Sequence, residues 1–92
     1  MKTWSDYKQN IKDNNPDIAT DVEEVEEISR LVGIMIQRRH FLNLSQRDLA
    51  EQCGIPHSSI ARIESGKSTP NLTTLVRIFD KLDLTLMAEP RK

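Results

Sequence analysis

The sequence predicts an all-α fold of five to six helices, with a helical extension before a helix-turn-helix core and a short strand at the C-terminus. Two short amphipathic segments flank a glycine between residues 45 and 67, apolar residues recur at helical spacing on both sides of them, and residues 82–87 alternate instead. We expect an acidic helical extension over 1–27, a helix-turn-helix domain over 28–82, and a dimerisation strand with its tail over 83–92.

The composition is that of one small domain of 92 residues, 29% charged and 37% hydrophobic. A single cysteine excludes an internal disulfide and fits a reducing cytoplasm, where we expect the protein. No apolar run approaches membrane-spanning length and the first residues are no signal peptide, so we expect no membrane partner. The sequence has no HExxH motif, phosphate loop or Cys/His cluster, so we expect no metal and no cofactor.

The first third of the chain differs from the rest in charge. Residues 1–36 hold 4 Lys/Arg and 8 Asp/Glu, a net of −4, whereas residues 37–92 hold 9 and 6, a net of +3. Trp4, Tyr7 and Ile11 are spaced as on a short amphipathic helix over residues 4–12, which either docks on its own core or is offered to a partner. The acidic residues 1–36 and the basic residues 37–92 therefore suit different partners. The plain alternative is that the glutamates over residues 23–27 only solvate a helix face.

A long helix is expected from Pro16 to Leu42, where a proline after an asparagine is typical of a helix start. One continuous stripe along this helix includes a serine and ends at Arg39, and Gly33 inside the helix allows another backbone to approach. The stripe consists of Val22, Val25, Ser29, Val32, Ile36 and Arg39, flanked by Ile28, Leu31 and Met35.

The hairpin that follows has local signals for each of its parts. Ser45 with Asp48 forms an approximate capping box, and Gly54 stands where a left-handed C-cap is needed. Ala50 and Gly54 are small residues, and we expect them where the two helices come closest. The apolar faces of the two helices consist of Leu49, Ala50, Cys53, Ile60 and Ile63. A helix, a turn with glycine and a second helix make the helix-turn-helix layout.

The second helix of the hairpin carries short polar side chains and one arginine near its N-terminus. A helix that enters the major groove reads base edges with its N-terminal residues, and a first-helix N-terminus can meet a phosphate. An enzyme is a poorer interpretation of His57, Ser58 and Ser59, because adjacent helical residues point in different directions and no third group orients them. Ordinary solvated residues on a helical hairpin are the plain alternative.

Residues Ile36 to Leu86 resemble the Cro/C1-type helix-turn-helix repressors, the XRE family, whose fold is lambda-repressor-like. The resemblance is carried by Gln46, Leu49, Ala50, Gly54, Ile60, Ile63, Glu64, Gly66, Pro70, Leu75 and Leu82. It implies a phosphate contact from Gln46, base contacts from the second helix, and a structural ion pair between Arg39 and Glu64. Asn43 stands where the family often has glycine, a mild departure because asparagine tolerates left-handed geometry.

The candidate DNA contacts are therefore polar or basic residues of the motif and its borders. They are Gln46, Arg47, His57, Ser58, Ser59, Arg62, Lys67 and Arg38. Arg38 also suits a basic helix end stabilised by the helix dipole, and His40 has no second ligand at metal spacing.

After the motif, Asn71 is expected to cap a last helix that covers the hairpin with an apolar stripe. The stripe consists of Leu72, Leu75, Val76, Phe79 and Leu82. Residues 83–88 then alternate, which predicts a strand paired with a second copy about a two-fold axis. A frayed tail or one more helical turn is the alternative.

These observations predict a sequence-specific repressor that binds double-stranded operator DNA as a homodimer. The acidic extension before the motif, the compact single-domain size and the strand-like tail resemble HigA-like antitoxins, which repress their own operon and neutralise a small, basic, RelE-like ribonuclease toxin. The expected toxin contacts are Trp4, Tyr7, Ile11, Asp21, Glu23, Glu24 and Glu27. The alternative is a stand-alone regulator without a toxin partner, whose N-terminal helices only enlarge the dimer.

Overall fold

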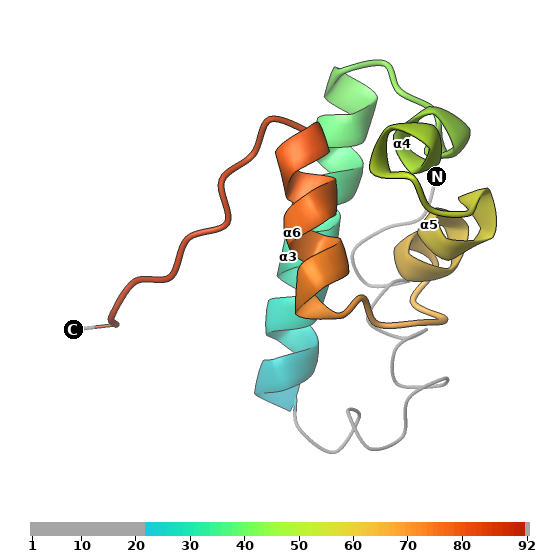
Figure 1. The fold of residues 1–92 in the computed structure, drawn as a ribbon. Coiled ribbons are helices and arrows are strands. Elements are labelled where there is room, and N and C mark those ends of the chain that lie inside the picture. The colour runs from blue at the N-terminus through green and yellow to red at the C-terminus, as the bar shows by residue number, and fades with distance from the viewer. Residues whose placement is uncertain (1–21, 92) are drawn as a thin grey trace.

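The longest helix, α3 (Val22–Phe41), forms one side of the fold in the computed structural model, which describes residues 22–91. Figure 1 shows α6 in front of α3, with α4 and α5 to one side of both. The side chains that α3 buries recur every three or four residues and so share one helical face. They are Val25, Ser29, Val32, Met35 and Arg39. The predicted start of this helix at Pro16 lies outside the described residues.

The two helices of the hairpin are α4 (Gln46–Cys53) and α5 (His57–Glu64). The capping box at the start of α4 is confirmed: the Asp48 N–H donates to Ser45 Oγ and the Ser45 N–H donates to Asp48 Oδ2, both at 2.9 Å. Gly54 ends α4 with φ 69°, the left-handed conformation that the sequence predicted. Pro56 is the N-cap of α5 and supplies no side-chain hydrogen bond, because it has no polar side-chain atom.

The prediction that Gly54 lies at a close approach of two helices was wrong. A Cβ added to this residue would meet no atom within 4 Å, so the glycine is needed for its backbone conformation and not for space. Ala50 is 2% exposed and lies in the core as expected. Cys53 also belongs to the core, because its side chain packs with the buried face of α4.

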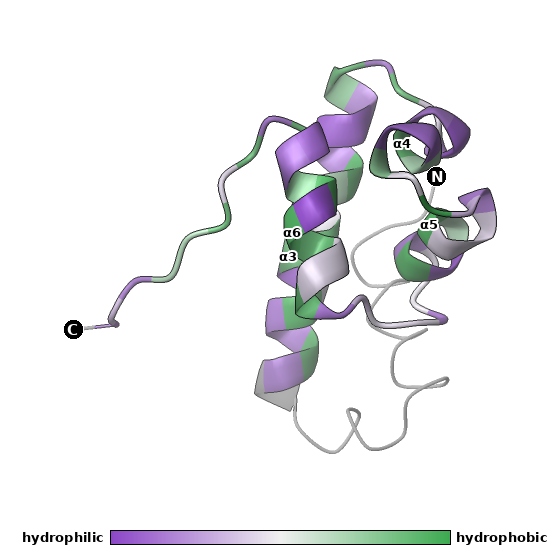
Figure 2. Cartoon of the chain, in the orientation of Figure 1, coloured by the Kyte–Doolittle hydropathy of each residue, from purple (hydrophilic) through white to green (hydrophobic). Residues whose placement is uncertain are grey.

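The last helix, α6 (Leu72–Lys81), is capped by Asn71, whose Oδ1 accepts the Thr74 N–H at 2.8 Å. Its buried face is rotated from the predicted stripe, because Ile78 is buried while Leu72 and Val76 are 69% and 49% exposed. Leu72 and Val76 therefore lie outside the buried core, although the hydropathy pattern placed them on the core face. Figure 2 shows that green, hydrophobic and purple, hydrophilic positions are interspersed along α3.

One apolar core joins the four helices. Residues from all of them contribute, and Ile55 and Leu44 of the connecting loops pack at its edge. The fully or nearly buried apolar members are Val25, Val32, Met35, Leu49, Ala50, Cys53, Ile60, Ile63, Leu75, Ile78, Phe79 and Leu82. The all-α class is confirmed, with four helices over residues 22–91 instead of the five to six predicted for the chain. The helix expected over residues 4–12 lies outside the described part.

The strand predicted over residues 83–88 is wrong for the described chain. Asp83 adopts a left-handed φ of 58°, and the Leu84 N–H donates to the Phe79 carbonyl at 2.8 Å, so these residues complete the end of α6. The tail beyond them projects from the helices (Figure 1) without regular secondary structure. A strand needs a hydrogen-bonding neighbour, and none of the described segments lies beside the tail as one.

The four described helices also bear on the expectation about membranes. None of them combines the length and the apolar character that a bilayer crossing requires.

Candidate nucleic-acid interface

Apart from Arg38 on α3, the candidate DNA-contacting residues lie on α4, α5 and the loop that follows them. Most are exposed: Arg47, His57, Ser58, Arg62 and Lys67. Gln46 and Ser59 are partly buried. Because α4 packs against α5 and Gln46 hydrogen-bonds to Glu64, the structure brings the start of α4 close to the C-terminal end of α5.

The start of α5 is free of side-chain caps. The Ser59 N–H donates to the Pro56 carbonyl at 3.0 Å, as part of the first turn. His57 and Ser58 therefore combine exposed polar side chains with a helix N-terminus whose first backbone donors have no side-chain cap. The free backbone N–H groups at such a helix end can donate hydrogen bonds to an acceptor group from outside the protein.

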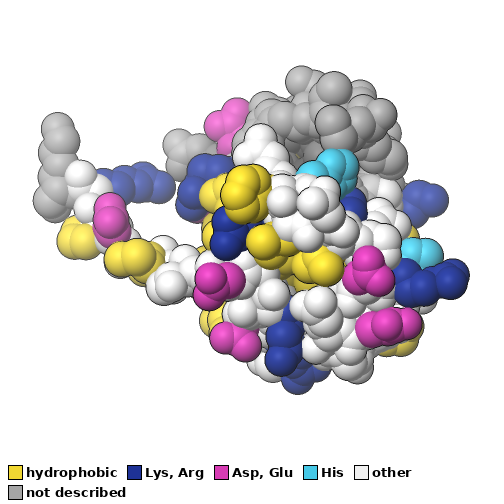
Figure 3. Space-filling view, turned by 90° about the horizontal axis from the view of Figure 1, so that it is seen from above, with side chains coloured by type: hydrophobic (Ala, Val, Ile, Leu, Met, Phe, Trp, Pro, Cys, Tyr) yellow, Lys and Arg dark blue, Asp and Glu magenta, His cyan; other side chains and the backbone are white. Residues whose placement is uncertain are grey.

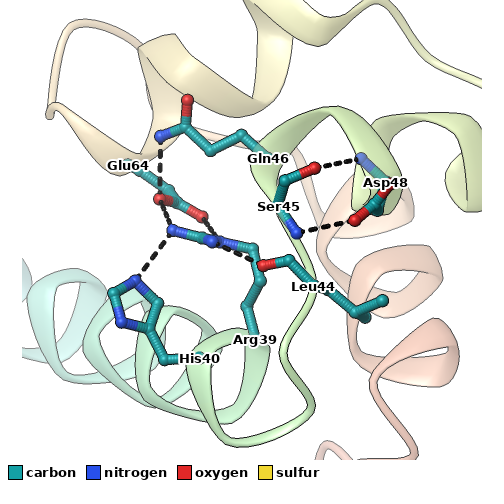
Figure 4. Close-up of polar contacts among 7 residues, drawn as sticks. All are labelled: Arg39, His40, Leu44, Ser45, Gln46, Asp48 and Glu64. Carbon is teal, nitrogen blue, oxygen red and sulfur yellow. Dashed lines mark hydrogen bonds and ion pairs between the residues drawn. The ribbon is translucent and has the colours of Figure 1, made fainter.

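A buried ion pair joins α3 to α5 beside this region (Figure 4). Arg39 Nε donates to Glu64 Oε2 at 2.7 Å and Arg39 Nη2 donates to Glu64 Oε1 at 2.8 Å, a bidentate arrangement. Both residues are less than 9% exposed. Arg39 Nη1 also donates to the Leu44 carbonyl at 2.8 Å, so the same guanidinium holds the loop before α4.

Two further side chains complete this cluster. Gln46 Nε2 donates to Glu64 Oε1 at 3.0 Å, and the His40 ring nitrogen Nε2 lies 3.1 Å from Arg39 Nη2. Because an arginine has no acceptor, His40 Nε2 must accept this hydrogen bond. Both residues line a hollow of about 360 Å³ whose other walls include Ile36, Ala61 and Ser65.

Sequence reasoning missed these partners of the ion pair. Gln46 and Glu64 are 18 positions apart, and no periodicity in the sequence connects them. The hydrogen bond from Arg39 to the Leu44 carbonyl was also missed, because a backbone acceptor leaves no signature in residue types. The proximity of His40 could have been suspected only from its place beside Arg39.

Arg38 lies at the opposite side of the α3 end, against α6. Its Nε donates to the Leu82 carbonyl at 2.9 Å, and its guanidinium carbon is 5.2 Å from the centre of the exposed Phe41 ring. Asp83 Oδ2 is 4.0 Å from Arg38 Nη2. The structure therefore places Arg38 as a link between the ends of α3 and α6, and its contact with DNA stays a prediction.

Of the expected toxin contacts, Trp4, Tyr7, Ile11 and Asp21 lie outside the described residues, as does the side chain of Glu23. Glu24 is exposed on α3. Glu27 is exposed as well and pairs with Arg30, one helical turn on, whose hydrogen bond lowers the pKa of the Glu27 carboxyl. The described acidic face is thus partly neutralised within α3.

Charges elsewhere on the surface are mixed. In the view of Figure 3, basic and acidic side chains alternate around the helical body, while hydrophobic side chains lie bare along the projecting tail. Within residues 22–91, no three His, Cys, Asp or Glu side chains are grouped as metal ligands would be.

Comparison with known proteins places the motif in a broader context. A family model described as Helix-turn-helix matches residues 37–87. An uncharacterized HTH-type transcriptional regulator of Haemophilus influenzae is 31% identical over 90 residues, which cover 95% of this chain and 84% of the relative. Antitoxin HigA1 of Mycobacterium tuberculosis is 33% identical over 72 residues, which cover 78% of this chain and 48% of the relative.

A third relative, the HTH-type transcriptional regulator y4dL of Sinorhizobium fredii, is 37% identical over 54 residues, covering 59% of this chain and 28% of the relative. The chain thus spans about half the length of the HigA1 relative and less of y4dL. No solved structure matches the chain.

Proposed function

The chain belongs to the XRE-type helix-turn-helix family of transcriptional regulators, and from this premise we propose that it is a sequence-specific repressor of operator DNA. The observation that carries the proposal is the exposed polar first turn of α5, a helix whose last residue, Glu64, is bound to Arg39 of α3 and to Gln46 at the start of α4. A recognition helix in the major groove uses such N-terminal residues to reach base edges.

The proposed contacts divide by role. His57 and Arg62, both exposed on α5, read base edges, and an arginine in bidentate contact with guanine discriminates by about 1–3 kcal/mol. Gln46 at the start of α4 and Lys67 after α5 hold phosphates, which position the protein without reading sequence. Arg47, Ser58 and Ser59 complete the proposed surface, and Arg38 approaches the backbone from the α3 end.

The test compares Arg62→Ala with the unchanged protein on two duplexes: DNA from upstream of the protein's own gene and a random sequence of equal length. We expect Arg62→Ala to lose affinity for the upstream DNA by about 10-fold or more and for the random DNA by much less. Arg77→Ala, an exposed arginine of α6, is the matched control and should change neither. An equal loss on both duplexes would make Arg62 a phosphate contact.

We also propose that the repressor is a homodimer. An apolar groove of about 510 Å³ lies between α6 and the tail, and its lining includes Phe79, Leu84 and Leu86. Leu72 and Met87, at 69% and 71% exposed, also line this groove. An exposed apolar surface of this kind is typical of an interface, and a second copy is the occupant that a two-fold symmetric operator requires.

The finer proposal is that this regulator is the antitoxin of a type II toxin–antitoxin pair. Two observations support it: the similarity to a protein named antitoxin HigA1, and the net charge of −4 over residues 1–36. A ribonuclease toxin must bind RNA, so its working surface is basic, and an acidic segment with Trp4 and Tyr7 as anchors suits such a surface.

Removal of residues 1–20 tests the antitoxin proposal. On this proposal the shortened protein still folds and binds the upstream DNA, but it no longer protects cells from a basic toxin encoded by the neighbouring gene. If the truncated protein still protects cells, the proposed contact between residues 1–20 and the toxin is refuted. The second candidate, a stand-alone regulator, is favoured by the Haemophilus influenzae relative, whose name mentions transcription alone.

A further inference from the structure

Glu64, like its partner Arg39, is a buried charged residue, and its carboxylate is shared between two other helices. Its carboxylate is 5% exposed and accepts hydrogen bonds from two nitrogens of Arg39 and from Nε2 of Gln46. The two donors come from α3 and α4, whereas Glu64 ends α5. Any group that meets Gln46 from outside is therefore connected to the ion pair through one hydrogen bond.

The carboxylate determines which way the Gln46 amide faces. An ionised carboxylate only accepts hydrogen bonds, so the amide must turn its nitrogen toward Glu64, and Figure 4 shows its oxygen directed away. A primary amide carries two N–H groups in one plane, about 120° apart. With one N–H given to Glu64, the second points away from that carboxylate oxygen.

Arg39 makes this arrangement compatible with DNA. A bare carboxylate behind a phosphate contact would repel the phosphate, but the bidentate guanidinium neutralises Glu64 at 2.7 and 2.8 Å. Four of the five N–H groups of Arg39 are engaged, two with Glu64 and one each with the Leu44 carbonyl and His40. Arg39 is thus occupied in holding Glu64, and the outward donor of the cluster belongs to Gln46.

We propose that Glu64 is a positioning residue for DNA binding, which holds one N–H of the Gln46 amide so that the other is aimed at a backbone phosphate. The inference rests on the proposed function, in which Gln46 meets the DNA backbone. It adds that this contact is prepared in the free protein, so that little side-chain freedom remains to be lost when DNA arrives.

A double-mutant cycle between positions 46 and 64 tests the proposal. The four proteins are the unchanged chain, Gln46→Ala, Glu64→Gln and the double variant, each bound to a random duplex of roughly 30 base pairs at low salt, where phosphate contacts dominate. The assay temperature is one at which circular dichroism shows all four folded. The effect of Gln46→Ala is measured once with glutamate and once with glutamine at position 64. The loss of charge at position 64 therefore cancels within each comparison.

We expect Gln46→Ala to weaken binding roughly 3- to 10-fold in the unchanged background and less than about 2-fold in the Glu64→Gln background. The salt dependence should be the same for the unchanged protein and Gln46→Ala, because an amide carries no charge. Equal losses in the two backgrounds would overturn the positioning role. No loss from Gln46→Ala would remove Gln46 from the interface, and an unchanged protein that does not bind DNA would refute the proposed function itself.

A measurement on the unaltered protein covers the case in which Glu64→Gln does not fold. The Gln46 side-chain amide is followed by nitrogen-15 NMR while the same duplex is added. We expect one amide proton to keep its resonance, because it stays on Glu64, and the other to shift and to exchange more slowly with water. Gln52, exposed at the far end of α4, is the internal control. If both amide proton resonances of Gln46 shift together, or if neither shifts, the proposal is overturned.

Discussion

At the scale of single residues, Arg39 and Glu64 are the charged side chains on which the helical arrangement most depends. Each is nearly buried, and each satisfies the other through two hydrogen bonds that link α3 to α5. Removing one partner leaves a buried charge without compensation, which costs more than the pair itself contributes. Together with the buried Ile60 and Ile63, this pair therefore holds α5, and with it the proposed DNA-binding surface, in place.

Glu64→Gln should lower the stability of the fold by about 3–5 kcal/mol. In a domain of this size each kcal/mol corresponds to roughly 4–8 °C of melting temperature, so the variant should melt at least about 12 °C below the unchanged protein. Glu51→Gln, on the exposed face of α4, is the matched control and should melt within a few degrees of it. Equal melting temperatures for the two variants would show that the pair contributes nothing.

Gly54 offers a second prediction, in which backbone conformation is separated from packing. Its φ is 69° and an added Cβ would meet nothing within 4 Å, so Gly54→Ala should cost only the left-handed strain, about 1–2 kcal/mol. Gly54→Asn should cost less, because asparagine tolerates this conformation. Urea unfolding measures both, and a loss above about 3 kcal/mol for alanine would point to a hidden clash.

At the scale of elements, the start of α4 is determined by four consecutive residues. Ser45 and Asp48 exchange hydrogen bonds of 2.9 Å and leave Arg47 free to face outward. The backbone N–H of Ser45, and then its hydroxyl, lower the pKa of the Asp48 carboxyl below its ordinary value of 3.8. The ionised form is the one that the folded protein stabilises.

The lowered pKa of Asp48 determines how its contribution to stability changes in acid. Because the folded pKa is lowered, Asp48 contributes its stabilisation fully above pH 3.8 and loses it as the pH falls through the lowered folded value. Asp48→Asn keeps an acceptor but cannot titrate. The difference in melting temperature between the unchanged protein and Asp48→Asn should therefore shrink from about pH 6 to about pH 2.5. A difference that is constant over this range would contradict the shift.

The elements also show which features a sequence can reveal. The caps at Ser45, Gly54 and Asn71 were predicted, because each depends on residues within one helical turn. The strand over 83–88 was predicted wrongly, because alternation describes which side chains share a face and not whether a neighbouring strand exists. The face of α6 was partly wrong for a similar reason, since a hydrophobic position on a helix can be covered by the same chain or left outward, as Val76 is.

The candidate site was less predictable than the elements. Its exposed residues follow from the motif, but the hydrogen bond from Gln46 to Glu64 joins two helices across 18 positions. Such contacts depend on how α4 and α5 cross, and hydropathy does not encode a crossing angle. The link from Arg38 to the Leu82 carbonyl spans 44 positions and depends in the same way on how α3 and α6 meet.

At the scale of the whole molecule, two surfaces lie on different sides of the helices. The proposed DNA-binding surface lies on α4 and α5, and the apolar groove lies between α6 and the tail, which leaves the body on the side away from them (Figure 1). A dimer formed through the groove would leave both recognition helices uncovered. Helix-turn-helix dimers place these helices about 34 Å apart to match one turn of DNA.

Val76→Glu should weaken this dimer, because it places a charge on the wall of the groove, where Val76 is 49% exposed. Thr73→Glu, exposed on α6 but outside the groove, adds the same charge and should leave the assembly unchanged. Sedimentation velocity distinguishes monomer from dimer in both variants. If Val76→Glu sediments as the unchanged protein does, the copies meet elsewhere.

The position of Cys53 has a practical consequence. It is the only cysteine of the chain, it is 5% exposed in the core, and burial raises the pKa of its thiol. A thiol reagent reacts with the thiolate, so it can modify this residue only when α4 separates from the core. The rate of modification therefore reports the opening of the helix-turn-helix motif in the natural protein, without an added label, and slower modification in the presence of DNA would measure how strongly binding closes the fold.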